Sequence, residues 1–146
     1  MQKFDSYSPQ DTYRWASELA KNAKAGDIYT LSGDLGAGKT LFAGGFAAGL
    51  RISSHVVSPT FTILSIYDDG VLPLYHFDMY RIEDVSELVN IGHEEYFYGD
   101  GVCLIEWPEM VAEAIPESAV KIRIEKDPAK GDDYRCITIS NMRGHS

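Results

Sequence analysis

The stretch "LSGDLGAGKTLFAGGF", residues 31–46, decides how the rest of this chain is interpreted. It begins as the end of a short, apolar, β-prone run (residues 27–33), tightens into glycines, and continues as a helical segment of small residues. Within it, Gly33-x-x-x-x-Gly38-Lys39-Thr40 matches the eight-residue phosphate-binding pattern in full. A strand before the glycines and a helix after them are the context in which this pattern binds phosphate. The sequence therefore predicts a loop for a nucleoside triphosphate.

The chemistry of this loop follows from its residue types. Glycines allow backbone angles that other residues avoid, so successive N–H groups can surround an anion. The following helix adds the positive end of its dipole, Lys39 can reach the β- and γ-phosphates, and the Thr40 hydroxyl can bind Mg²⁺. Gly44, Gly45 and Gly49 lie inside this helix at a cost of about 1 kcal/mol each relative to alanine. We attribute them to close packing of the helix against the sheet.

Two acidic residues are candidates for positions next to the bound metal ion. The runs "VCLIE" and "PLYHFD" end in Glu106 and Asp78, and both acids should lie at the carboxyl edge of the sheet. Because "VCLIE" is the more continuous apolar run, we expect it beside the loop's strand, with Thr40 and Glu106 binding Mg²⁺. Asp78 should lie further out, near the γ-phosphate. In "SPTF", the Thr60 hydroxyl is the predicted nucleotide-sensing switch.

The remaining patterns predict a single α/β domain over residues 1–146 with a mixed parallel and antiparallel sheet. Helical spacing and caps predict helices over residues 8–26 and 83–92. An aspartate-glycine turn at residues 68–70 predicts a hairpin, with Pro73 at an edge or bulge. Alternating runs at residues 120–126 and 134–140 predict a C-terminal hairpin.

Composition limits the function classes. With 13 basic and 22 acidic residues, the formal net charge of −9 disfavours direct, tight binding of nucleic acid. Both cysteines, Cys103 and Cys136, lie in apolar runs and are expected to be small buried hydrophobic residues. The sequence shows no signal peptide and no membrane span, so we expect a cytoplasmic protein. No N-K-x-D-like segment appears near the C-terminus, which favours adenine over guanine.

Four motifs in this order, "GDLGAGKT", "SPTF", "YHFDMYR" and "IEWP", resemble the TsaE family over essentially the whole chain. TsaE proteins are small bacterial ATPases that support threonylcarbamoyladenosine modification of transfer RNA. The resemblance implies a P-loop NTPase-like three-layer fold, with ATP and Mg²⁺ as cofactors. It implies a weak ATP hydrolase that binds and resets an assembly of the TsaB and TsaD proteins and meets transfer RNA only through them.

The resemblance also implies roles for individual residues. The catalytic set would be Lys39, Thr60 and Asp78, and the metal ligands would be Thr40 and Glu106. His76 is expected to make structural hydrogen bonds, and Arg81 to pair with an acid or to face a partner. Nucleotide contacts would come from Gly33, Asp34, Leu35, Gly36, Ala37, Gly38, Lys39, Thr40, Leu41 and Trp107, although the Trp107 ring could equally be a core residue.

Two other function classes remain open from the residues alone. A small kinase would keep the phosphate loop but needs an arginine-bearing lid over the acceptor. The six arginines do not cluster in the sequence as such a lid would suggest. A nucleotide-gated binding module, in which hydrolysis is incidental, is the non-enzymatic alternative.

Overall fold

The computed structural model describes residues 2–34, 36–59 and 61–141. The elements in chain order are β1 (Gln2–Ser6), α1 (Pro9–Ala20), β2 (Ile28–Ser32), α2 (Lys39–Gly49), β3 (Leu64–Tyr67), β4 (Leu74–Asp78), α3 (Ser86–Ile91), α4 (His93–Phe97), β5 (Val102–Glu106), the 3₁₀ helix η1 (Pro108–Ala114), β6 (Val120–Lys126), the 3₁₀ helix η2 (Pro128–Lys130) and β7 (Arg135–Ser140).

The strands of the described part form one sheet of seven, in the order β1-β7-β6-β2-β5-β4-β3. The inner strands β4, β5, β2 and β6 are parallel, whereas β3, β7 and β1 pair with antiparallel neighbours. Strand β5 lies directly beside β2, and β4 lies one strand further out, as the sequence predicted. The mixed sheet is therefore confirmed.

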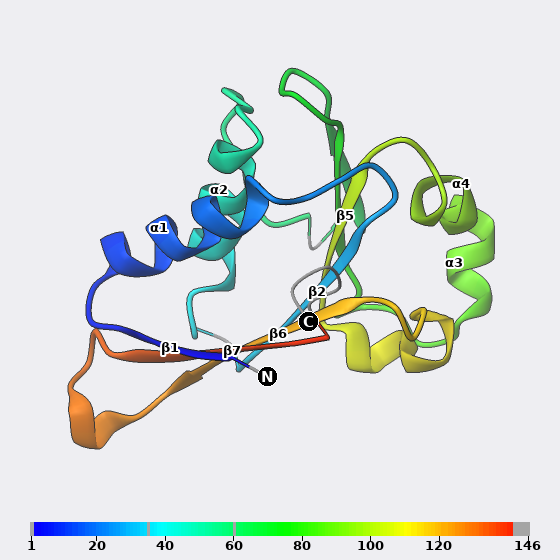
Figure 1. Cartoon of the computed structure of the whole chain (residues 1–146). Helices are drawn as coiled ribbons and strands as arrows, with labels where there is room; N and C mark the ends of the chain where they lie inside the picture. The colour runs from blue at the N-terminus through cyan, green and yellow to red at the C-terminus, as the bar shows by residue number, and fades with distance from the viewer. Residues whose placement is uncertain (1, 35, 60, 142–146) are drawn as a thin grey trace.

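Helices cover both faces of the sheet, so the fold has three layers (Figure 1). Helices α1 and α2 pack on one face over alternating apolar residues of β2, β6 and β7. On the other face, α3 and α4 pack with apolar residues of β4 and β5. Strand β5 is buried along its whole length because it is covered on both faces. The three-layer α/β fold agrees with the prediction.

Three sequence expectations differ from the structure in detail. The first helix ends at Ala20 because the next residues form tighter turns, with Asn22 N donating to Leu19 O. The helix expected from residue 83 begins at Ser86, because the carboxylate of Glu87 accepts the backbone N–H groups just before it. Pro73 lies immediately before β4, which has neighbours on both sides, so its placement at an edge or bulge is wrong.

The N-terminal strand β1 and the helix η1 were not predicted. Strand β1 is short and mostly exposed, and it forms only by pairing with β7 at the far end of the chain. The Tyr134 hydroxyl also donates to the Asp5 carboxylate at 2.6 Å. Sequence patterns within residues 2–6 cannot indicate a contact with a segment about 130 residues away.

The two cysteines are free thiols with different surroundings. Cys103 is fully buried in β5, and burial raises the pKa of its thiol to about 12, as expected for an inert core residue. Cys136 on β7 is half-buried, so the expectation of a buried residue holds only for Cys103.

The glycines of α2 pack against α1, not against the sheet as the sequence analysis assumed. A Cβ built at Gly45 would lie well under 3.0 Å from the backbone O of Tyr13, and one at Gly49 would clash with Ser17 O in the same way. A Cβ at Gly44 would meet only the Tyr13 ring, at an ordinary 3.7 Å. Two of the three helix glycines therefore permit the close approach of α1 and α2.

This contrast predicts opposite effects of two adjacent substitutions. Gly45→Ala should lower the free energy of unfolding by about 1–3 kcal/mol, because backbone atoms of α1 must move. Gly44→Ala, the matched control, should raise it by up to about 1 kcal/mol through better helix propensity. Chemical denaturation of both variants measures the difference. Equal effects at the two positions would contradict the close helix-helix contact.

Candidate functional site

The glycine-rich loop connects β2 to α2 at the carboxyl edge of the sheet. Gly36 and Gly38 have φ angles of 79° and 106°, a region that side-chain-bearing residues rarely adopt. Gly38 is the N-cap of α2, and Phe42 N donates to its backbone O at 2.9 Å. The first N–H groups of α2 are thus presented at the loop, as an anion site at a helix N-terminus requires.

Lys39 folds back over this loop. Its ammonium donates to the backbone O of Gly33 and, at 3.3 Å, to that of Asp34, and the residue is only 7% exposed. Burial lowers the pKa of Lys39 from its ordinary value, and nearby negative charges partly offset this effect. These charges belong to Glu106, Glu109, Asp78 and Asp34. One cation is therefore placed among acidic groups at the edge of the sheet.

Trp107 lies beside the loop and also packs against the apolar core around β4 and β5. Its ring centroid is 3.9 Å from the Lys39 ammonium and 4.8 Å from the Tyr80 ring centroid. The residue has a left-handed backbone, with φ 56° and ψ 50°, directly after β5. This turn directs the half-buried indole to the loop, where it also lines a cavity of about 200 Å³ with Gly33 and Asp34. The structure therefore combines the two interpretations, since Trp107 borders the loop and packs against the core, and its contact with a nucleotide stays a prediction.

The two candidate acids lie side by side at the same sheet edge. Glu106 is in register with Leu31 of β2 on one side and with Asp78 of β4 on the other. Glu106 is 2% exposed and Asp78 is 3% exposed. Two buried carboxylates at the ends of adjacent parallel strands, next to the loop's strand, confirm the predicted placement at the carboxyl edge.

Each carboxylate has its own hydrogen-bond partners. His76, which is fully buried in β4, contacts Glu106 with its Nε2 at 2.6 Å from Oε2. Asp78 accepts from the Ser58 hydroxyl at 3.1 Å and from the backbone N–H of Tyr80 at 3.0 Å. The two carboxylates are thus positioned by different partners. His76 was expected to make structural hydrogen bonds, and the structure shows that its partner is Glu106.

The C-terminal hairpin also reaches the loop. Arg135 Nε donates to the backbone O of Ala37 at 2.8 Å, and Arg135 belongs to β7, 98 residues further along the chain. The Lys126 ammonium lies 3.4 Å from the position that a Cβ of Gly36 would occupy. Two cations of the hairpin therefore border the loop. Sequence reasoning missed both, because no local pattern links the hairpin to the glycines.

The structure brings together most of the predicted site. Lys39, Asp78, Glu106, Trp107 and the described loop residues lie around the carboxyl ends of β2, β5 and β4. Thr40 follows Lys39 in the first turn of α2, and no hydrogen bond within the described residues joins Thr40 to Glu106. Leu41 is partly exposed on α2, next to Thr40. Leu35 and Thr60 lie outside the described residues.

The segment before Thr60 contributes in a way that the sequence analysis missed. The switch hydroxyl was assigned to Thr60, but Ser58 of the same motif bonds directly to Asp78. Arg81 has its guanidinium 4.4 Å from the ring centroid of Phe61, which is 82% exposed. Arg81 thus contacts the "SPTF" segment through an aromatic ring, and within the described residues no ion pair joins it to an acid. Its role toward a partner stays a prediction.

The fold and the glycine-rich loop together define an α/β protein of the P-loop NTPase-like type. Comparison with known proteins identifies its family. The sequence model for "Threonylcarbamoyl adenosine biosynthesis protein TsaE" matches residues 6–135, and the chain belongs to this TsaE family.

Individual relatives agree with this assignment. The chain is 51% identical over 138 residues to the Bacillus subtilis protein named "tRNA threonylcarbamoyladenosine biosynthesis protein TsaE", covering 94% of this chain and 84% of that protein. It is 43% identical over 135 residues to the protein of the same name from Treponema pallidum, covering 92% and 97% respectively. The crystal structure of Bacillus subtilis YdiB superimposes with a TM-score of 0.80 and 45% identity, covering 94% of this chain and 83% of YdiB.

Two features are absent from the described part of the chain. In residues 2–34, 36–59 and 61–141, no helix is both long and apolar enough to cross a membrane. Over the same ranges, no group of three or more His, Cys, Asp or Glu side chains is arranged to bind a metal ion.

Proposed function

We propose that this protein is a Mg²⁺-dependent ATPase that supports threonylcarbamoyladenosine modification of transfer RNA in the cytoplasm. Family membership supports the role in this modification. The main observation in favour of ATPase activity is the buried Lys39 ammonium at the glycine-rich loop, near the carboxylates of Glu106 and Asp78. A lysine and a nest of N–H groups bind phosphates, and buried acids at the same edge provide the metal side.

The donor set fits Mg²⁺. Thr40 supplies a hydroxyl at the start of α2, and Glu106 supplies a buried carboxylate, both of them hard oxygen ligands. Without a cation, triphosphate oxygens would meet the negative charges of Glu106, Asp78 and Asp34, which surround Lys39. When bound, Mg²⁺ would neutralise charge on the β- and γ-phosphates.

The remaining polar groups of the site have distinct tasks in this proposal. His76 holds Glu106 in one orientation through the 2.6 Å hydrogen bond. Asp78, one strand further out, orients the attacking water or relays the state of the γ-phosphate to Ser58. Thr60 supplies the switch hydroxyl of the same segment. Each turnover thereby moves a surface segment whose position a partner protein can sense.

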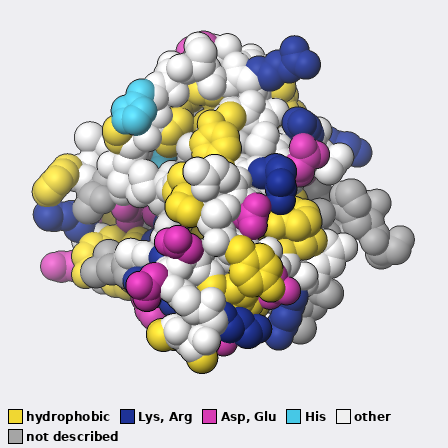
Figure 2. Space-filling model, turned by 90° about the vertical axis from the view of Figure 1, so that its left-hand side faces the viewer, with side chains coloured by type: hydrophobic (Ala, Val, Ile, Leu, Met, Phe, Trp, Pro, Cys, Tyr) yellow, Lys and Arg dark blue, Asp and Glu magenta, His cyan; other side chains and the backbone are white. Residues whose placement is uncertain are grey.

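The partners proposed for this protein are TsaB and TsaD, whose assembly ATP turnover would reset. Transfer RNA would be reached only through them. The net charge of −9 supports an indirect role. On the face shown in Figure 2, acidic and basic side chains are interspersed and do not form a continuous basic surface.

The kinase alternative has weaker support. A lid needs arginines that converge on the transferred phosphoryl group. Arg135 instead binds backbone oxygens of Ala37, Asp132 and Tyr134, and Arg81 contacts the Phe61 ring. Arg123 lines the cavity beside the loop, but a single arginine is not the convergent group that a lid needs.

Reconstitution of the modification tests the proposal. With TsaB, TsaD, transfer RNA and ATP, addition of this protein should allow many rounds of modification, whereas its omission should stop the reaction after about one round per assembly. The Lys39→Ala variant should behave like omission. Equal yields with and without the protein would contradict the proposal.

Two further arms of the same experiment separate the alternatives. A non-hydrolysable ATP analogue should support at most one round, and many rounds with the analogue would favour a nucleotide-gated binding module. Phosphate release that partners stimulate supports the ATPase. A phosphorylated product made by the isolated protein would favour the kinase.

A further inference from the structure

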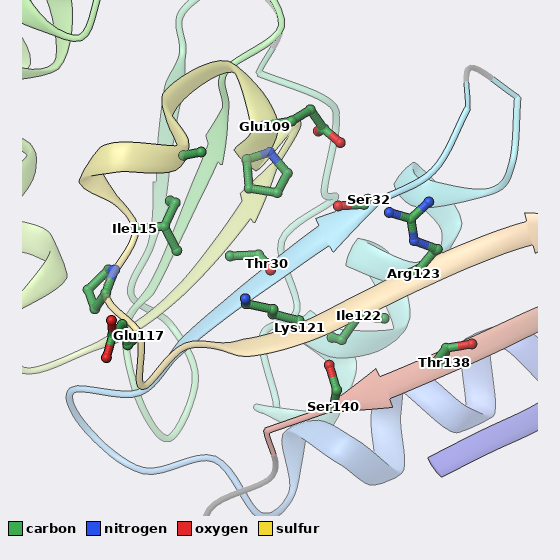
Figure 3. A pocket seen from close by; sticks show the side chains of 13 residues that line it. Thr30, Ser32, Glu109, Ile115, Glu117, Lys121, Ile122, Arg123, Thr138 and Ser140 are labelled. Carbon is green, nitrogen blue, oxygen red and sulfur yellow. The ribbon is translucent and has the colours of Figure 1, made fainter. Parts of the chain in front are cut away.

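A second hollow of the molecule lies outside the loop and its two carboxylates. It is a groove of about 610 Å³ on the face of the sheet that α1 and α2 leave uncovered (Figure 3). Its floor is formed by β2, β6 and β7, and one wall by η1 and the residues that follow it. Because side chains alternate along a strand, the floor consists of residues between the core positions of these strands.

Two cations lie side by side on this floor. Lys121 and Arg123 are two residues apart on β6, so both point to the groove face, and both are exposed. No hydrogen bond or ion pair joins either side chain to another residue in the described part of the chain. The two acids of the groove, Glu109 and Glu117, belong to its wall, so the cations make the floor the part of the groove that favours an anion.

A hydroxyl on the neighbouring strand points to the same place. Thr30 of β2 is 4% exposed and lines the groove, and its hydroxyl has no hydrogen-bond partner among the described residues. Figure 3 shows it beside Lys121, with the hydroxyls of Thr138 and Ser140 across β6. Because this hydroxyl opens into the groove, a ligand there could bond to it directly.

The wall formed by η1 and the residues that follow it is mainly apolar. It consists of Pro108, Ala112, Ile115 and Pro116. Glu109 and Glu117 stand at the two ends of this wall, facing Arg123 and Lys121 respectively. These acids disfavour a long polyanion such as a nucleic acid backbone. They leave room for one anionic group on the floor and an apolar body against the wall.

The sheet topology also excludes a peptide that binds by adding a strand to the sheet. Strands β2, β6 and β7 each have a neighbour on both sides, so the groove offers no free edge to an added peptide strand. Its volume falls in the range of small-molecule sites, which is about 300–1,000 Å³. We propose that this groove binds a small organic anion, a carboxylate or a phosphate ester with an apolar body, through Lys121, Arg123 and Thr30.

NMR titration of the ¹⁵N-labelled protein tests this site. The probes are phenylacetate and phenyl phosphate, and 2-phenylethanol is the neutral control with the same apolar body. We expect saturable shifts of amides in residues 30–32, 121–123 and 138–140, with either or both anions. The neutral control should bind at least about tenfold more weakly, because it lacks the charge-assisted hydrogen bonds.

Variants assign the binding to the groove residues. The double variant Lys121→Gln/Arg123→Gln should lower the affinity by at least about tenfold, and Thr30→Val by roughly threefold to tenfold. The matched control is Arg14→Gln/Lys21→Gln, which removes the same charge from α1 and the residue after it, on the other face, and should leave the affinity unchanged. The amide spectrum of each variant reports whether the fold is intact.

The outcomes that would overturn this proposal are distinct from those for the ATPase. Arg123 and Glu109 also line the cavity beside the loop, so an anion could enter there instead. Shifts confined to residues 33–40 that disappear in Lys39→Ala would assign the anion to the loop. Equal binding to the Lys121→Gln/Arg123→Gln variant, or no saturable shift up to about 10 mM of either anion, would also refute the groove site.

Discussion

Replacing Lys39 by alanine is expected to lower the affinity for Mg²⁺–ATP by about 100-fold, while the affinity for ADP falls less. The ammonium would make charge-assisted hydrogen bonds to both the β- and γ-phosphates, each worth about 1.5–3 kcal/mol. ADP lacks the γ-phosphate and therefore loses fewer of these bonds. Isothermal titration calorimetry with both nucleotides measures the two losses.

The structure determines the controls for this experiment. Lys39 also contacts the Gly33 and Asp34 carbonyls and the Trp107 ring, so thermal unfolding of Lys39→Ala must show that the fold survives. Lys24→Ala removes the same charge from an exposed position before β2 and should leave nucleotide affinity unchanged. If Lys39→Ala binds ATP like the unaltered protein, the loop is not a phosphate site.

The second prediction with a large expected effect distinguishes the roles of Glu106 and Asp78. Glu106→Gln should weaken Mg²⁺-dependent nucleotide binding by at least about tenfold, because it removes the negative charge of the proposed metal ligand. Asp78→Asn should keep binding within about threefold but lower turnover by at least about 100-fold, as loss of a group that orients water would do. Titration of Mg²⁺ against nucleotide affinity, together with measured ATP turnover, distinguishes these results.

The choice of glutamine at position 106 follows from the buried His76. An alanine there would leave His76 Nε2 without a partner, and an unsatisfied buried group costs about 1–3 kcal/mol of stability. Glutamine keeps an oxygen that can accept from His76 and removes only the charge. A larger loss of metal dependence in Asp78→Asn than in Glu106→Gln would mean that the two roles are reversed.

Sequence patterns were sufficient wherever the deciding interactions are local. The glycine-lysine-threonine pattern, the apolar run of β5 and the alternation in β6 and β7 each reflect neighbours within a few residues. The greater continuity of β5 even predicted that Glu106 lies nearer to β2 than Asp78 does. A strand buried on both faces must be apolar throughout, so its sequence alone indicates a central position.

Sequence patterns failed where a contact joins distant segments. Nothing in residues 2–6 indicates pairing with β7, and nothing near Arg135 indicates a hydrogen bond to the loop. The packing partner of Gly45 and Gly49 was assigned to the sheet, although α1 occupies that side of α2. Helical spacing shows that a close approach occurs, but not which neighbour makes it.

By itself, then, the sequence determined the loop, the order of the main elements and the residue types of the site. The tertiary structure decided how these residues act together: His76 contacts Glu106, Ser58 bonds to Asp78, and Trp107 lies against Lys39. It also places two cations, which have no partner among the described residues, beside Thr30 in an open groove. The physical reason is that backbone geometry and hydrophobic periodicity are encoded locally. Hydrogen bonds between side chains of different strands exist only after the sheet has set their register.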